Sequence, residues 1–171
     1  MGKSILITGG ARSGKSRFAE ELVLGMAGRG IYIATAEAHD AEMADRIAAH
    51  QARRGAEWQT IAAPLDLAQA LRATEGETPR LVDCLTLWLT NQMLGNHDWT
   101  TATNTMAETL RKMTAPTVLV TNEVGSGIVP DNALARQFRD AAGWMNQTIA
   151  AACDEVYIVA AGCPLKVKPY A

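Results

Sequence analysis

The sequence has few cysteines and almost no excess of charge of either sign. Three cysteines, Cys84, Cys153 and Cys163, stand far apart among 171 residues. This odd number and wide spacing provide neither a disulfide framework nor a paired zinc motif, and they suit a reducing compartment. The 16 basic and 18 acidic residues give a net charge of −2. A near-neutral chain has no bulk attraction for polyanions, which argues against a general nucleic-acid or membrane-surface binder.

Long apolar runs are also lacking. The longest, such as residues 85–89, are far too short to span a bilayer. The chain enters an apolar segment at Ile5 without the longer apolar region and cleavage site of a signal peptide, so we expect a cytoplasmic protein. The 48% apolar and 20% charged residues exclude a disordered tail or a coiled coil. The length suits one domain, residues 1–171.

Short apolar segments alternate with helical patterns along the chain. The segments are apolar throughout, as in strands buried on both faces of a parallel sheet. Repeated strand–helix units therefore predict a single α/β domain with a mostly parallel sheet flanked by helices. Residues 91–105 are polar, and we expect them to be irregular and a candidate lid. The predicted strands are 4–8, 31–35, 80–83, 117–121 and 156–160, and the predicted helices are 16–26, 41–53, 65–73 and 133–153.

A complete phosphate-binding loop motif, G-x-x-x-x-G-K-[ST], follows the first predicted strand and opens the first predicted helix. It comprises Gly9, Gly10, Ala11, Arg12, Ser13, Gly14, Lys15 and Ser16. Its glycines let backbone N–H groups point at phosphate oxygens, and the helix N-terminus adds partial positive charge. Lys15 is expected to reach the β and γ phosphates, and the Ser16 hydroxyl to bind Mg²⁺. Motif and context together predict a P-loop nucleotide site.

P-loop enzymes usually place a second carboxylate on the Mg²⁺ side of the site, after another buried strand. Asp83 ends the predicted strand at residues 80–83 and is the first candidate. Glu123 follows the next strand, enters a glycine-rich loop, and is the alternative. Both fall at the carboxyl edge of the sheet, where open α/β folds bind ligands. A turn aspartate without a ligand remains a second interpretation of Asp83.

A histidine lies among arginines in residues 40–54. If this segment is helical, Arg46, His50 and either Arg53 or Arg54 share one stripe. Neighbouring cations favour the neutral imidazole, which is the nucleophilic form, and guanidinium groups can hold phosphate oxygens. The stripe is therefore a candidate for attack on a nucleotide α-phosphate. The alternative is a charged helix face in solvent.

Four segments together resemble the bifunctional adenosylcobinamide kinase / adenosylcobinamide-phosphate guanylyltransferase family of cobalamin biosynthesis. The P-loop motif and the sequence Asn-Glu-Val-Gly-Ser-Gly-Ile-Val-Pro form its most specific combination. The likeness extends from about residue 4 to about residue 168. The segments are residues 8–20, residues 32–36 with the arginine–histidine helix, residues 82–89 and residues 121–130.

The resemblance implies a RecA-like fold, a homotrimer and two reactions. ATP or GTP phosphorylates the aminopropanol hydroxyl of adenosylcobinamide. GTP then transfers GMP to an enzyme histidine, and adenosylcobinamide phosphate takes the GMP to give adenosylcobinamide-GDP. The family motif Arg-Ile-x-x-His falls on Arg46 and His50. The resemblance thus makes His50 the expected guanylylated residue and Arg46 a residue that neutralises phosphate charge.

The same resemblance places nucleotide contacts on the P-loop and on three further segments. Family members often carry an acid where this chain has Ala62, so the sequence offers no carboxylate there for the guanine N–H edge. The implied contacts are Gly9, Gly10, Ala11, Arg12, Ser13, Gly14, Lys15, Ser16, Ala34, Thr35, Ala36, Gln51, Ala52, Arg53, Arg54 and Cys84.

Two other functions are compatible with the sequence. The first is a single-activity P-loop kinase for another small hydroxyl substrate, in which His50 is only a helix-face residue. The second is a RecA-like binding module that uses a nucleotide as a conformational switch. The chain shows no appended domain, basic face or tail, which argues against the second function.

Overall fold

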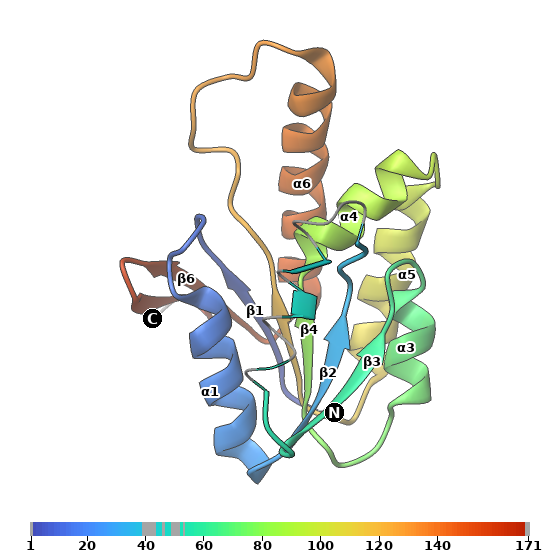
Figure 1. Ribbon diagram of the computed structural model, residues 1–171, viewed down its shortest axis with the longest axis vertical. Coiled ribbons are helices and arrows are strands. Elements are labelled where there is room, and N and C mark those ends of the chain that lie inside the picture. Colours follow the sequence, from blue (N-terminus) through green and yellow to red (C-terminus); the bar gives the residue numbers. More distant parts are fainter. Residues whose placement is uncertain (1, 39–43, 46, 49–51, 53, 170–171) are drawn as a thin grey trace.

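A seven-stranded sheet forms the centre of the protein (Figure 1). The computed structural model describes residues 2–38, 44–45, 47–48, 52 and 54–169. Neighbouring strands are parallel from β3 to β6, whereas β6 and β7 are antiparallel. The spatial order is β3 (Trp58–Ala62), β2 (Gly30–Ala34), β4 (Arg80–Asp83), β5 (Thr117–Val120), β1 (Ser4–Thr8), β6 (Glu155–Ala160) and β7 (Cys163–Lys168).

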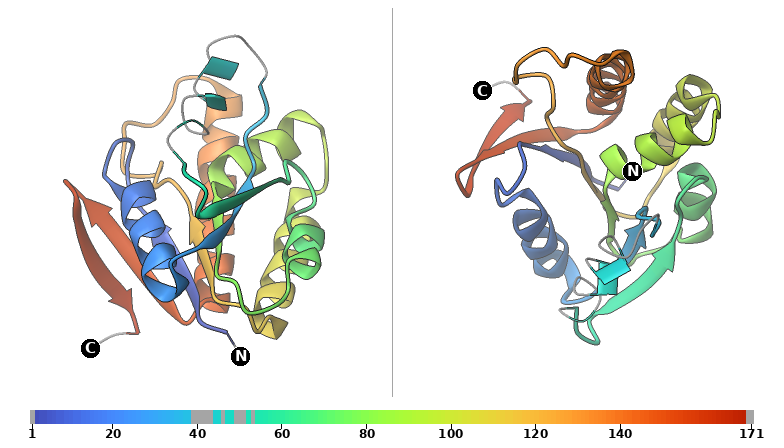
Figure 2. Two further views of the ribbon diagram at one scale, coloured as in Figure 1. Left: turned by 60° about the horizontal axis from the view of Figure 1, so that its bottom comes forward. Right: turned by 45° about the horizontal axis from the view of Figure 1, so that its top comes forward.

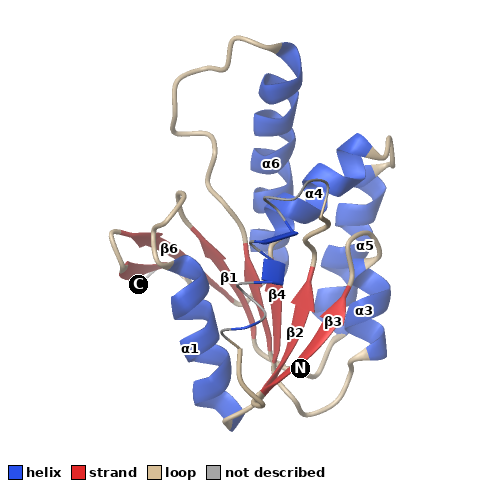
Figure 3. Cartoon of the chain, in the orientation of Figure 1, coloured by secondary structure: helices blue, strands red, loops and turns tan. Residues whose placement is uncertain are grey.

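Helices cover both faces of this sheet, as Figures 2 and 3 show. Helix α1 (Lys15–Ala27) lies on one face. The opposite face carries α3 (Leu67–Ala73), α4 (Leu85–Leu94), α5 (Trp99–Lys112) and α6 (Ala133–Ala152). The two layers follow from strand alternation, since side chains of successive strand residues point to opposite faces.

The central strand β1 shows how this alternation divides the core. Ile5 and Ile7 are buried with Val23 of α1, whereas Leu6 is buried with Leu85 of α4 and the helices beyond it. Both faces of the strand are therefore apolar, which explains why its sequence contains no polar alternation. The parallel strands also bring their carboxyl ends to one edge, the upper edge in Figure 1.

The predicted α/β fold with a mostly parallel sheet is confirmed. Each of the five predicted strands overlaps an observed one, and the helices predicted at residues 16–26, 65–73 and 133–153 correspond to α1, α3 and α6. The helix predicted at residues 41–53 lies largely outside the described residues. Within it, residues 44–45, 47–48 and 52 are helical. None of the described helices is both long and apolar enough to cross a membrane.

The prediction of an irregular segment at residues 91–105 is correct only for residues 95–98 and wrong for the rest. Residues 91–94 belong to α4 and residues 99–105 belong to α5. Asp98 is the N-cap of α5, and its carboxylate accepts a hydrogen bond from the Thr101 N–H at 3.0 Å. Threonine-rich α5 has modest helix propensity, but Met106 and Leu110 bury one face of it against the core. Tertiary packing thus decides the structure here rather than local propensity.

The five predicted strands do not include β3 and β7, the two outer strands of the sheet. In β3 only a few side chains are partly buried, because the strand lies at one edge of the sheet. The other edge strand, β7, is mostly exposed and forms a hairpin with β6 through Ala161 and Gly162. Exposed edge strands carry little of the apolar signal that marks central strands.

Trp88 gives a direct test of the core on the four-helix face. Its side chain is 1% exposed, and its indole N–H donates to the Leu65 carbonyl at 2.6 Å. We predict that Trp88→Ala lowers the free energy of unfolding by about 3–5 kcal/mol, because a large cavity opens and the Leu65 carbonyl loses one of its two side-chain donors. Urea denaturation followed by circular dichroism measures the change.

Trp144→Ala is the matched control. Trp144 is 39% exposed and makes an edge contact with Trp99, with ring centroids 5.5 Å apart. Loss of this contact should cost only about 1 kcal/mol. Equal destabilisation by the two substitutions would contradict the burial assigned to Trp88.

Candidate active site

The P-loop connects the end of β1 to the start of α1. Gly14 is the N-cap of α1 with φ 95°, and Arg12 also has a left-handed backbone with φ 56°. The Lys15 ammonium donates to the Gly10 carbonyl at 3.1 Å and therefore lies across the loop. The backbone is thus already curled into the form that points N–H groups at an anion.

This curl requires glycine where the loop meets β6. A Cβ atom on Gly9 would lie 2.5 Å from the Val159 carbonyl oxygen and 2.7 Å from Ser13 Oγ. The β6–β7 turn also supports the loop, because the Gly162 N–H donates to the Ser13 carbonyl at 2.8 Å. No local sequence motif marks residues 161–163, and the structure shows that this turn supports the P-loop backbone.

A cavity of about 460 Å³ opens beside the P-loop at the carboxyl edge of the sheet. Its volume is in the range of small-molecule sites. It brings together the P-loop, the ends of β2 and β4, part of β3 and the chain just before β3. The described lining residues are Ala11, Lys15, Ser16, Tyr32, Ala34, Ala36, Ile47, Arg54, Thr60, Ala62, Asp83, Cys84, Leu87 and Asn122.

The cavity gathers eight of the sequence-predicted site residues. These are Ala11, Lys15, Ser16, Ala34, Ala36, Arg54, Asp83 and Cys84. The sequence did not single out Tyr32, Thr60, Leu87 or Asn122 as site residues, although Tyr32, Leu87 and Asn122 lie within segments that carry the family resemblance. Ala62 lines the cavity where the family pattern predicts an acid, so the position meets the ligand space without a charge.

The other predicted residues have several different placements. Gly9, Gly10, Arg12, Ser13 and Gly14 shape the P-loop, and Thr35 is fully buried behind the cavity. His50, Arg46, Gln51 and Arg53 lie outside the described residues, whereas Ala52 is helical and exposed.

Thr35 holds the ends of two strands together. Its hydroxyl donates to the Cys84 carbonyl at 2.7 Å and accepts from the Cys84 N–H at 2.8 Å. The Asn91 amide of α4 donates to the Thr35 carbonyl at 2.8 Å and to the Pro64 carbonyl at 3.1 Å. These contacts fix the positions of Ala36 and Asp83 relative to α4.

Asp83 makes a short hydrogen bond with a neighbouring residue of the cavity. Its carboxylate accepts a 2.6 Å hydrogen bond from the hydroxyl of Tyr32 on the neighbouring strand β2. Burial and the negative charge of Asp83 raise the pKa of Tyr32 well above its usual value, so the phenol stays protonated and donates. The Arg54 guanidinium carbon lies 3.6 Å from the centroid of the Tyr32 ring.

Glu123 is engaged in its own loop. Its carboxylate accepts from the backbone N–H groups of Gly125 at 2.6 Å and Ser126 at 3.1 Å. Hydrogen bonds, first from the Ser126 side chain and then from these N–H groups, lower the pKa of Glu123. Glu123 is not among the described residues that line the cavity, so the geometry favours Asp83 over Glu123 as the carboxylate facing a nucleotide.

Cys84 cannot act as a thiolate at neutral pH. The side chain is buried, and burial together with the charge of Asp83 raises the pKa of its thiol to about 11. Cys84 is the N-cap of α4 and packs with the apolar residues facing α1. Its contribution to the site is therefore the neutral wall of the cavity.

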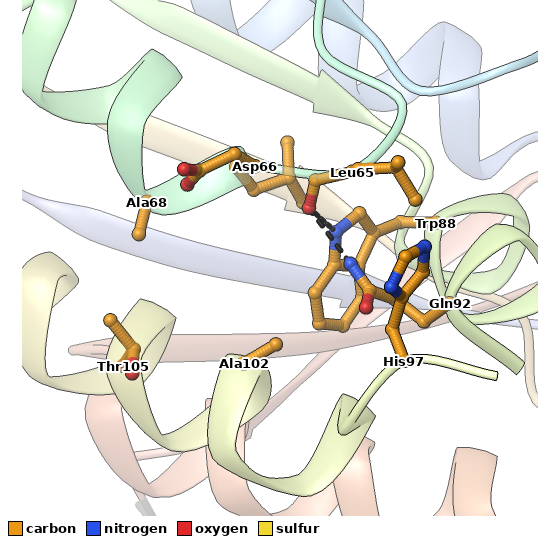
Figure 4. Close-up of a pocket in the computed structure, with 9 residues that line it drawn as sticks. Leu65, Asp66, Ala68, Trp88, Gln92, His97, Ala102 and Thr105 are labelled. Carbon is orange, nitrogen blue, oxygen red and sulfur yellow. Dashed lines mark hydrogen bonds between the residues drawn. The ribbon is translucent and has the colours of Figure 1, made fainter. Parts of the chain in front are cut away.

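A second cavity of about 280 Å³ lies between α3, α4 and α5 (Figure 4). The Trp88 indole and the Gln92 amide both donate to the Leu65 carbonyl, at 2.6 and 2.9 Å. His97 lines this cavity rather than the one beside the P-loop. The paired donors of α4 hold the connection from β3 to α3 and so support the β3 wall of the larger cavity.

The contact between Gly9 and β6 generates a prediction. Gly9→Ala should weaken nucleotide binding by at least about tenfold, because the added methyl group must displace backbone and open the curl that orients the N–H groups. Isothermal titration calorimetry measures binding, and thermal denaturation measures the accompanying loss of stability.

Gly10→Ala is the matched control for stability, since a Cβ atom at Gly10 meets nothing within 4 Å. Its melting temperature should stay near that of the wild type. If Gly9→Ala binds nucleotide as tightly as the wild type, close backbone approach is not what shapes the loop.

Comparison with known proteins gives matches over nearly the whole chain. Residues 5–167 match the family model described as cobinamide kinase / cobinamide phosphate guanyltransferase. The bifunctional adenosylcobalamin biosynthesis protein CobP of Pseudomonas aeruginosa is 47% identical over 167 residues, 95% of this chain and 96% of that protein. CobU of Salmonella typhimurium, with the same description, is 43% identical over 180 aligned positions, covering 96% and 99% of the two chains.

Solved structures show the fold independently of sequence. An ATPase from the type III secretion system of pathogenic bacteria superimposes with a TM-score of 0.57 at 10% identity, covering 92% of this chain and 51% of that one. At such low identity the match supports the P-loop ATPase-like fold alone. The length and identity of the sequence matches, with the complete P-loop, show that this chain belongs to the cobinamide kinase / cobinamide phosphate guanyltransferase family.

Proposed function

We propose that this chain is a bifunctional enzyme that phosphorylates adenosylcobinamide and then transfers GMP from GTP to the resulting phosphate. The observation that carries the proposal is one cavity shared by Lys15 and Ser16 of the P-loop, Asp83 at the end of β4, and Arg54. The family membership supplies the substrate class. The homotrimer and the cytoplasmic location stay predictions.

The kinase reaction needs positioning and charge stabilisation more than covalent chemistry. The substrate hydroxyl oxygen attacks the γ-phosphorus, the bond to the β–γ bridging oxygen breaks, and the nucleoside diphosphate leaves while the hydroxyl proton passes to solvent. Lys15 and the N–H groups at the start of α1 face the phosphates in our proposal and oppose their growing negative charge.

Ser16 and Asp83 are the proposed protein ligands of Mg²⁺. The ion prefers hard oxygen donors and usually takes one or two protein ligands together with phosphates and water. A hydroxyl and a carboxylate lining the same cavity fit that preference. Within the described part of the chain, no group of three or more acidic, histidine or cysteine side chains forms a self-sufficient metal site. When bound, Mg²⁺ neutralises phosphate charge.

The guanylyl transfer proceeds in two displacements in our proposal. A nitrogen of His50 attacks the α-phosphorus of GTP, the α–β phosphoanhydride bond breaks, and pyrophosphate leaves. A phosphate oxygen of the acceptor then attacks the same phosphorus, the P–N bond breaks, and the imidazole is regenerated. His50 stands between Ile47 and Arg54 in the sequence, and both of these residues line the cavity, which supports this assignment.

Covalent labelling tests the histidine intermediate. Protein incubated with Mg²⁺ and α-³²P-labelled GTP should keep the label after denaturation, and the bond should be acid-labile and alkali-stable, as a phosphoramidate is. His50→Ala should abolish the label, because the attacking nitrogen is removed. His97→Ala is the control and should keep it, since His97 lines the other cavity.

The labelling result separates the alternatives. Wild-type protein that binds GTP but takes no label would leave a single-activity kinase or a nucleotide switch. Phosphorylation of adenosylcobinamide, measured in parallel with γ-³²P-labelled ATP and GTP, would then show an adenosylcobinamide kinase and its phosphoryl donor. Without that phosphorylation, a kinase of another hydroxyl substrate or a nucleotide switch would remain.

A further inference from the structure

Tyr32 lies between two charged groups of the cavity. It is 4% exposed, on β2, and its hydroxyl donates to Asp83 Oδ2 at 2.6 Å. Its ring lies beneath the Arg54 guanidinium, with 3.6 Å from the guanidinium carbon to the ring centroid. One side chain therefore contacts both the end of β4 and the segment that follows His50.

The surrounding residues hold the ring of Tyr32 in place. Trp58 on β3 packs edge-on, with ring centroids 5.8 Å apart and planes at 89°. Trp58 in turn lies over Gly30, where a Cβ atom would come within 2.7 Å of the Trp58 ring. A ring fixed by these contacts presents its hydroxyl and its face in constant directions, which is what a support for other side chains requires.

We infer that Tyr32 is a positioning residue that holds Asp83 through its hydroxyl and Arg54 through its ring face. The inference rests on the proposed function for the roles of Asp83 and Arg54. Tyr32 itself need not touch a reacting atom. Its hydroxyl fixes the orientation of the carboxylate proposed to bind Mg²⁺, and its ring holds a guanidinium four residues beyond the proposed nucleophile.

The chemistry of a phenol suits this position. A neutral donor orients Asp83 without cancelling its charge, whereas lysine or arginine would compete with the metal for the carboxylate. The hydrogen bond uses Oδ2 and leaves Oδ1 as a metal donor. The ring face attracts a guanidinium by a cation–π interaction, which strengthens when water is excluded.

Two substitutions separate the two contacts. Tyr32→Phe removes the hydroxyl and keeps the ring. It should weaken GTP binding about tenfold in the presence of Mg²⁺, the usual scale for a hydrogen bond to a charged group, and leave binding in EDTA almost unchanged. Tyr32→Leu also removes the ring face. It should in addition slow the rate of GMP labelling at saturating Mg²⁺ and GTP.

The readouts are calorimetric GTP affinity with Mg²⁺ and with EDTA, and the Mg²⁺ concentration for half-maximal labelling. A residue that only maintained the fold would lower both affinities alike. Tyr32→Phe should raise the half-maximal Mg²⁺ concentration by more than it lowers the maximal labelling rate. Wild-type behaviour of Tyr32→Phe, or equal losses with and without Mg²⁺, would overturn the inference.

Tyr157→Phe is the matched control. The Tyr157 hydroxyl also donates to a carboxylate, Glu155 at 3.0 Å, but on β6 and away from the residues that line the cavity. It should leave the Mg²⁺ dependence unchanged. If the wild type takes no GMP label, the guanylyl-transfer proposal fails, while calorimetry on Tyr32→Phe still decides the Tyr32–Asp83 contact.

Discussion

The close approach of the P-loop backbone to β6 is the contact on which the site depends. Gly9 has no room for a side chain beside the Val159 carbonyl, and the β6–β7 turn donates through Gly162 to Ser13. The loop is therefore curled before any nucleotide arrives, and Lys15 already lies across it. Preorganised N–H groups and a fixed ammonium stabilise phosphate charge without the cost of rearranging. The edge hairpin thus supports the P-loop from outside the cavity.

Helix α4 holds the part of the cavity formed by the ends of β2 and β3, as the β6–β7 turn holds the P-loop. Asn91 holds the carbonyls of Thr35 and Pro64, while Trp88 and Gln92 share the Leu65 carbonyl. Connections that follow β2 and β3 are thus tied to one helix rather than left free at the sheet edge. Asp83 lies just before that helix and is held in turn by Tyr32. Ligand-facing loops become precise when rigid elements hold them, which both proposed transfer reactions require.

The sequence predicts those structural features that depend on a local residue pattern. The P-loop and the central strands carry strong signals, because glycine placement and unbroken apolar runs have direct structural causes. Helix α5 does carry a helical apolar spacing, with Met106 and Leu110 four residues apart on its buried face, but the polar, threonine-rich residues around them favour an irregular segment when the sequence is taken alone. In the sequence, Tyr32 has the features of an ordinary strand residue. Its contacts with Asp83 and Arg54 join segments that lie far apart in the chain. Long-range pairs of this kind cannot be derived from one sequence without the strand order.

The central claim is that one nucleotide cavity serves both reactions, and Lys15→Ala tests it most directly. The measurement is the rate of GMP labelling from α-³²P-labelled GTP beside the rate of adenosylcobinamide phosphorylation, in wild type and variant. Lys15 lines the shared cavity, so the account predicts that both rates fall by at least about a hundredfold, the scale of losing a principal charge-stabilising contact. Phosphorylation lost while labelling proceeds at the wild-type rate would contradict the account and require a second nucleotide site.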